Sequence, residues 1–118
     1  MTENIIQKKS FEFAVQIVET YKYLVNEKRE FVLSKQLLRS GTSIGANVSE
    51  AARGQSKKDF VYKLQISRKE ANETLYWLNL LQATNFIQLE SSEKLMKQCD
   101  ELLRILTAII KTTETKLG

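Results

Sequence analysis

Residues 56–84 read SKKDFVYKLQISRKEANETLYWLNLLQAT, and this stretch decides the fold. Residues at every third or fourth position form one stripe: Phe60, Leu64, Ser67, Ala71, Leu75, Leu78 and Gln82. That period predicts a helix over 57–84, with Ser56 and Asp59 at the spacing of a capping box. Such a helix is roughly 40 Å long at about 1.5 Å per residue. It therefore implies an elongated bundle whose helices all have a similar length.

The segment before this helix is ambiguous. Leu33 and Leu37 begin a helical pattern over 32–53, but residues 40–52 read SGTSIGANVSEAA, in which nine of thirteen are Gly, Ala, Ser or Thr. Gly41 and Gly45 would each cost a helix roughly 1 kcal/mol relative to Ala. Either the helix breaks there, or the small side chains let another helix approach closely.

Two further helices are predicted, over 10–25 and 92–113. Ser10 is the expected N-cap of the first, and Ser91 or Ser92 that of the last. Their expected buried stripes are Phe11, Ala14, Val15, Val18, Tyr21 and Val25, and Leu95, Cys99, Leu102, Leu106, Ile109 and Thr113. Four helices with short connections predict an all-α fold, an antiparallel up-down-up-down four-helix bundle that makes residues 1–118 one domain.

The composition supports a helical domain and excludes much chemistry. The 118 residues contain no Pro and only four Gly. The chain has no His, which excludes catalysis by an imidazole base and di-iron sites built from Glu-x-x-His pairs. The single Cys99 forms neither an intramolecular disulfide nor a thiolate zinc site, and its place in an amphipathic run predicts burial. We therefore expect no enzymatic activity, no metal and no cofactor.

The distribution of apolar residues bears on the compartment. Residues 1–10 are polar and no secretory cleavage site follows them. No apolar run approaches the roughly 20 residues of a membrane span. The sequence therefore predicts a cytoplasmic protein without a membrane partner.

Positive charge is concentrated in the middle of the chain. Residues 28–69 hold ten Lys or Arg and three acids, a net of +7, whereas the remainder carries −3, which together make the overall +4. A basic segment in an otherwise acidic chain predicts a phosphate-binding surface, and the alternative is a solvated helix face. The candidate nucleic-acid contacts are Arg39, Arg53, Lys57, Lys58, Lys63, Arg68 and Lys69.

Aromatic and polar residues suggest interfaces. Tyr62, Tyr76 and Trp77 either stack on nucleotide bases or pack against another helix, subunit or protein partner. Ser43, Asn47 and Glu50 share one helix face, and polar residues at such positions often set register or oligomeric state. The residues expected to accompany them are Arg39 and Ser40 upstream, with Glu70 and Glu73 from the next helix if the two pack antiparallel.

Several of these residues together resemble a known family. The shared pattern is Arg39-Ser40-x-x-Ser43-Ile44-x-x-Asn47-Val48-Ser49-Glu50, then Ser56-x-x-Asp59-Phe60-x-x-Lys63-Leu64-x-Ile66 and Lys69-Glu70-Ala71-Asn72-Glu73-Thr74-x-Tyr76-Trp77-Leu78. It resembles the signature of the 23S rRNA intervening-sequence proteins over roughly 8–112. One departure is Ala51, where the family often has Gly, which puts a close backbone approach there in doubt.

The resemblance implies a helical 39–53 and a small cytoplasmic bacterial protein. It also implies antiparallel four-helix bundles that assemble into barrel-like homopentamers, with no established enzymatic activity. A distant relative, the accessory protein of diversity-generating retroelements, is a basic pentamer that binds nucleic acid and a reverse transcriptase. The combined expectation is a non-enzymatic, ring-like homo-oligomer that binds RNA or DNA. The alternative is an adaptor or scaffold for a protein partner, with no nucleic-acid role.

Overall fold

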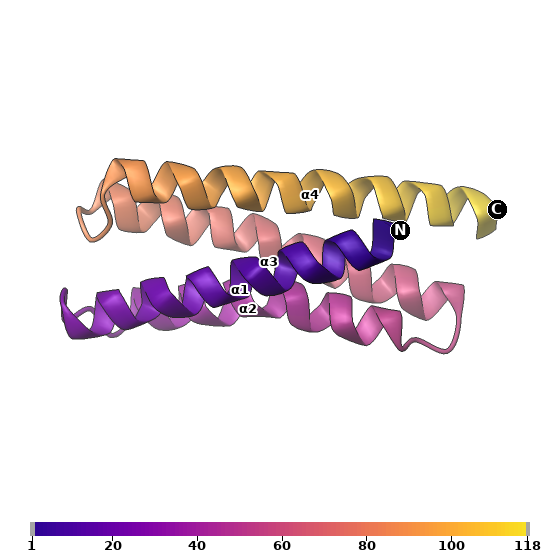
Figure 1. Cartoon of the computed structure of the whole chain (residues 1–118), viewed down its shortest axis with the longest axis horizontal. Helices are drawn as coiled ribbons and strands as arrows, with labels where there is room; N and C mark the ends of the chain where they lie inside the picture. Colours follow the sequence, from indigo (N-terminus) through magenta and orange to yellow (C-terminus); the bar gives the residue numbers. More distant parts are fainter. Residues whose placement is uncertain (1, 118) are drawn as a thin grey trace.

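The computed structural model describes residues 2–117, and the side chains of 5–116; Met1 and Gly118 of the predicted domain lie outside it. It consists of four helices, α1 (Thr2–Asn26), α2 (Leu33–Ala52), α3 (Lys57–Ala83) and α4 (Leu89–Leu117). They form an elongated bundle of 48 × 21 × 20 Å (Figure 1). The all-helical bundle expected from the sequence is therefore confirmed.

The helices are arranged around one central core. α3 packs against α2 and α4, and α1 packs against the same two helices, so that α1 and α3 lie diagonally opposite. The α1–α2 and α3–α4 loops lie at one end, and the α2–α3 turn lies at the other end with both chain termini (Figure 1). The apolar core runs along the axis and takes buried side chains from every helix.

Four of the seven positions in the stripe predicted for α3 are buried, whereas Phe60, Leu75 and Gln82 are only half-buried. Leu64, Ser67, Ala71 and Leu78 are all inaccessible to solvent or nearly so. The Ser56 hydroxyl accepts the Asp59 N–H at 3.1 Å, which caps the first turn as predicted. At the other end Asn85 has a φ of 67°, and a left-handed residue of this kind ends a helix.

α2 is continuous through both glycines, which settles the ambiguity of the sequence. A Cβ at Gly41 would lie 2.8 Å from two side-chain carbons of Ile17, and one at Gly45 would lie 3.2 Å from the Ser10 carbonyl oxygen. Both positions therefore have to be small because α1 crosses them closely. The packing of α1 offsets the helix-propensity cost of roughly 1 kcal/mol per glycine.

The first turn of α2 is capped by a residue that the sequence pattern did not single out. The Glu30 carboxylate accepts the N–H groups of Val32, Leu33 and Ser34 at 3.1, 3.0 and 2.6 Å. Burial by itself raises the pKa of Glu30, but these bonds and one to the Ser34 side chain outweigh it, so the pKa is lowered. The polar stretch between α1 and α2, Asn26-Glu27-Lys28-Arg29-Glu30, thus contains the cap of the next helix.

α1 begins earlier than predicted, at Thr2 instead of about residue 10. Ser10 is not an N-cap, since it lies inside the helix, is 1% exposed, and donates its hydroxyl to the Gln7 carbonyl at 3.3 Å. The added turns place Ile6 in the core, where it is 2% exposed. Burial of this side chain accounts for a helix that continues beyond the predicted cap.

The buried face of α1 is also different from the predicted one. Phe11 is 68% exposed and Val15 46% exposed, although both belong to the stripe expected in the core. The buried apolar residues of α1 are Ile6, Phe13, Ile17 and Leu24. Both sets have helical spacing, so α1 is apolar on two faces, and contact with the small residues of α2 decides which face is buried.

α4 is longer than the predicted 92–113 at both ends. Ser92 does not cap it, because its N–H donates to the Gln88 carbonyl at 3.0 Å and its hydroxyl donates to the Leu78 carbonyl at 3.4 Å. The predicted stripe is buried from Leu95 to Ile109. Cys99 is part of it, as expected, and its thiol donates to the Ala71 carbonyl at 3.3 Å.

Candidate nucleic-acid interface

The outward face of α3 carries a row of exposed polar and aromatic side chains. Six positions follow a spacing of four, three, four, three and four, which keeps them on one side of a helix. All six are exposed in the structure. We call this row the α3 outer stripe, and it consists of Lys58, Tyr62, Gln65, Lys69, Asn72 and Tyr76.

Cations are concentrated around the first half of this stripe. Residues 53–69 contain six Lys or Arg and a single acid, Asp59. Of the predicted nucleic-acid contacts, five form no ion pair with any residue that the structure describes. They are Arg53, Lys57, Lys58, Arg68 and Lys69, of which Arg68 is half-buried and the others are exposed.

The other two predicted contacts already have partners. The Arg39 guanidinium binds Glu70, with 3.2 Å between Nη1 and Oε1, and also binds Glu73. Lys63 Nζ lies 2.8 Å from the Glu50 Oε1, and this hydrogen bond raises the pKa of Lys63. A phosphate would have to compete with these carboxylates, so Arg39 and Lys63 are less available than the five unpaired cations.

The three aromatic residues of α3 that the sequence indicated as contacts differ in exposure. Trp77 is half-buried against the core, and its indole N–H donates to the Glu73 Oε2 at 3.2 Å. Tyr76 is 60% exposed and meets the Trp77 ring nearly perpendicularly, with ring centres 5.0 Å apart. Tyr62 is also 60% exposed. The two tyrosines are therefore accessible, whereas Trp77 belongs to the network that joins α3 to Arg39.

The polar ridge predicted on α2 is mostly engaged by its own helix. The Ser43 hydroxyl donates to the Arg39 carbonyl at 2.5 Å, and the Asn47 amide donates to the Ser43 carbonyl at 2.8 Å. Ser40 differs, because it is buried and its hydroxyl oxygen lies 3.0 Å from that of Thr74. Glu70 and Glu73 approach α2 at Arg39, not at the centre of the ridge.

Ser67 and Thr74 join α2 to α3 in the core, a role that the sequence pattern did not indicate. Ser67 donates its hydroxyl to the Ile44 carbonyl at 2.8 Å, and Thr74 contacts Ser40. Both are fully buried. The sequence signal for this role was a small hydroxyl residue in the predicted buried stripe, as at Ser67, or directly beside it, as at Thr74. A buried hydroxyl needs a hydrogen-bond partner, which here is supplied by α2.

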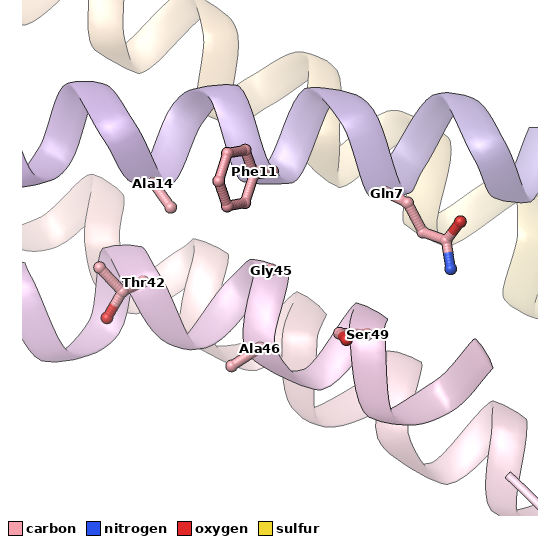
Figure 2. A pocket seen from close by; sticks show the side chains of 7 residues that line it. All are labelled: Gln7, Phe11, Ala14, Thr42, Gly45, Ala46 and Ser49. Atoms are coloured by element: carbon pink, nitrogen blue, oxygen red, sulfur yellow. The ribbon is translucent and has the colours of Figure 1, made fainter. Parts of the chain in front are cut away.

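A groove lies between α1 and α2 beside the exposed Phe11. Its volume is about 390 Å³. In Figure 2 the Phe11 ring, with Gln7 and Ala14, stands on α1 facing the small side chains of α2. The residues lining it are Gln7, Phe11, Ala14, Thr42, Gly45, Ala46 and Ser49. The sequence did not indicate this groove because Phe11 was assigned to the core.

The described part of the chain has neither a membrane-spanning helix nor a cluster of metal-ligating side chains. Between residues 2 and 117, no helix combines the length and the apolar character that crossing a bilayer requires. Among the side chains of residues 5–116, no three His, Cys, Asp or Glu gather as a metal site would require.

Comparison with known proteins relates the whole bundle to one group. The family described as 23S rRNA-intervening sequence protein matches residues 2–108. The chain is 55% identical to a protein with unknown function from the S23 ribosomal protein family of Bacteroides thetaiotaomicron, known from a crystal structure. The two superpose with a TM-score of 0.93, covering 94% of this chain and 99% of the other. No curated protein matches the chain.

Proposed function

Because this chain belongs to the 23S rRNA-intervening sequence protein family, we propose that it is a non-enzymatic helical bundle that binds RNA. The proposed contact surface is the basic region of residues 53–69 on the end of α2 and the first half of α3. The proposal places the protein in the cytoplasm, where it meets RNA. It leaves the identity of the RNA open, since charge recognises phosphate whatever the base sequence.

One observation carries the proposal: five cations lie within residues 53–69 without a carboxylate partner among the side chains of residues 5–116. By contrast, the predicted contacts Lys63 and Arg39 are paired, Lys63 with Glu50 and Arg39 with Glu70 and Glu73. The unpaired set also adjoins the N-terminus of α3, whose backbone N–H groups favour an anion. A surface of this kind attracts a polyanion from a distance and holds its phosphates on contact.

The test is fluorescence anisotropy of the protein with labelled RNA over a salt series from about 50 to about 200 mM. Each phosphate neutralised on a single strand contributes about 0.7 to the slope of log affinity against log salt. Contact with all five cations therefore predicts a slope of about −3.5. Absence of binding at the lowest salt, or a slope near zero, would contradict the proposal.

The helix directions that we infer are those of an antiparallel up-down-up-down bundle. Contacts along α2 support this, because Ser40, Ile44 and Glu50 meet successively earlier positions of α3, at residues 74, 67 and 63. The loops at alternating ends also support it (Figure 1). In this arrangement the basic region lies at the end of the bundle that also holds both termini.

A second function, protein association, is supported by the groove beside Phe11. A Phe ring that is 68% exposed over an apolar, small-residue surface is a common anchor of protein contacts. We infer that another copy of the chain occupies it, in the ring-like homopentamer implied by the family resemblance. If a different protein occupies this groove instead, the chain functions as an adaptor.

Self-association through the groove makes a separate prediction. Phe11→Lys removes the apolar anchor and should convert the oligomer to monomers, as read from molar mass by light scattering after gel filtration. Phe31→Lys is the matched control, because Phe31 is 48% exposed in the α1–α2 loop and lies outside the groove. An unchanged oligomer in Phe11→Lys would assign the contact to another surface, and a monomeric parent protein would leave the groove to a different partner.

A further inference from the structure

Two exposed tyrosines lie on the same outer face as two of the unpaired lysines. Tyr62 and Tyr76 are each 60% exposed, and they belong to the α3 outer stripe with Lys58 and Lys69. Along the helix the order is Lys58, Tyr62, Lys69, Tyr76, so cation and ring alternate. Phosphate binding alone requires only the lysines, and a solvent-facing ring in each of two separate turns needs another explanation.

We propose that the α3 outer stripe binds unpaired nucleotides, with Tyr62 and Tyr76 stacking on bases, Lys69 holding a phosphate between them and Lys58 holding one beyond Tyr62. This inference rests on the proposed function and specifies its ligand as a single strand. The bases of a duplex are stacked on each other in its interior, so a tyrosine ring on a helix surface does not reach their faces. In a single strand every base offers a face to an aromatic ring.

The dimensions of the stripe suit such a strand. Fourteen residues separate Tyr62 from Tyr76, which is about 21 Å along the helix. At the rise of about 3.4 Å for stacked bases, this distance corresponds to about six nucleotides. Tyr76 is held from one side by its perpendicular contact with Trp77, so its ring orientation is restrained before a base arrives.

Neighbouring charges limit the path of the strand. Gln65 donates to Glu114 of α4 at 3.3 Å, which places a carboxylate on the α4 side of the stripe. On the α2 side, Glu70 and Glu73 share the single Arg39 guanidinium, so this cluster keeps one net negative charge. The strand therefore follows the α3 outer stripe, where the lysines and tyrosines lie, and stays away from Glu114.

The experiment compares a labelled single-stranded RNA of about 12 nucleotides with the duplex of the same sequence. Tyr62→Ala and Tyr76→Ala should each weaken single-strand binding roughly 5- to 160-fold, which is the stacking contribution of one base converted to a ratio. Duplex affinity should change less than about twofold, because only the phosphate contacts are used there. Tyr62→Phe keeps the ring and should bind the single strand as the parent protein does.

Tyr23→Ala is the matched control, since Tyr23 is also exposed but lies on α1, which does not contact α3. The inference is overturned if the tyrosine variants bind the single strand like the parent, or lose single-strand and duplex affinity equally. It is also overturned if Tyr62→Ala lowers the oligomeric mass, because a second copy would then cover the stripe. Absence of all RNA binding by the parent protein would instead overturn the proposed function itself.

Discussion

Replacing Lys58 and Lys69 together by Glu is expected to weaken RNA binding about 100-fold. Both are exposed on the α3 outer stripe and have no ion-pair partner among the residues that the structure describes. A hydrogen bond to a charged group contributes at least about 1.5 kcal/mol, or about tenfold in affinity, so two lost contacts give about 100-fold. Anisotropy with the labelled RNA at a fixed low salt measures the loss.

The fold should survive this double substitution. Glu in place of Lys58 sits in the first turn of α3, where a carboxylate interacts favourably with the helix dipole. Glu in place of Lys69 adds a like charge four residues before Glu73, which costs only about 0.2–0.5 kcal/mol. Circular dichroism and the melting temperature should therefore remain close to those of the parent protein.

Lys8→Glu with Lys22→Glu is the matched control for net charge. It also lowers the charge by four, but both residues are exposed on α1, across the bundle from α3. The control should bind RNA far better than Lys58→Glu with Lys69→Glu. Equal losses in the two double variants would mean that net charge, and not this surface, governs binding, and would remove residues 53–69 from the proposed site.

Cys99 should react with iodoacetamide about 1,000-fold more slowly in the folded protein than in denaturant at the same pH. Burial raises the pKa of the Cys99 thiol from its ordinary 9.0 to about 12, and the nearby Asp100 carboxylate adds to this increase. Each pH unit below the pKa lowers the reactive thiolate tenfold, so three units give the expected ratio. A time course of alkylation followed by mass spectrometry measures it.

The same pKa change predicts how stability depends on alkaline pH. The folded protein holds the thiol proton more tightly than the unfolded chain, so this stabilisation is complete below about pH 9 and is lost as pH rises toward about 12. Between about pH 9 and about pH 12, loss of this stabilisation lowers the free energy of unfolding by about 1.4 kcal/mol per pH unit. Because Lys and Tyr also titrate there, Cys99→Ala is the reference, and it should show a shallower decline. Parallel declines, or rapid alkylation of the folded protein, would mean that Cys99 is accessible.

The sequence predicted much of the fold because helix period and helix ends are local properties. The buried positions at Leu64, Ser67, Ala71 and Leu78 and the cap at Ser56 depend on residues a few positions apart, and all are present in the structure. The predicted caps at Ser10 and at Ser91 or Ser92 were wrong, because all three serines lie inside helices that begin earlier, and Ser10 and Ser92 are turned into the core. A serine near a helix start looks the same in sequence whether it caps the helix or fills a small buried space.

The sequence predicted the nucleic-acid site as a set of seven basic residues. The structure separates those that are paired with a carboxylate from those that are not. All seven basic residues looked equivalent in the sequence, yet Arg39 and Lys63 bind carboxylates that are 31, 34 and 13 positions away along the chain. Such pairings depend on how α2 and α3 are aligned. Composition therefore indicated a basic region but not which cations remain free to bind a phosphate.

The sequence by itself determined that this protein is a four-helix bundle with a basic middle segment, because amphipathic periodicity and charge count belong to the chain. Only the tertiary structure decided which of two apolar faces of α1 is buried. The deciding contacts are those of Ile17 at Gly41 and of the Ser10 backbone at Gly45, between helices far apart in sequence. As a result Phe11 faces outward instead of filling the core, since only a close fit to the small residues of α2 distinguishes one apolar stripe from the other.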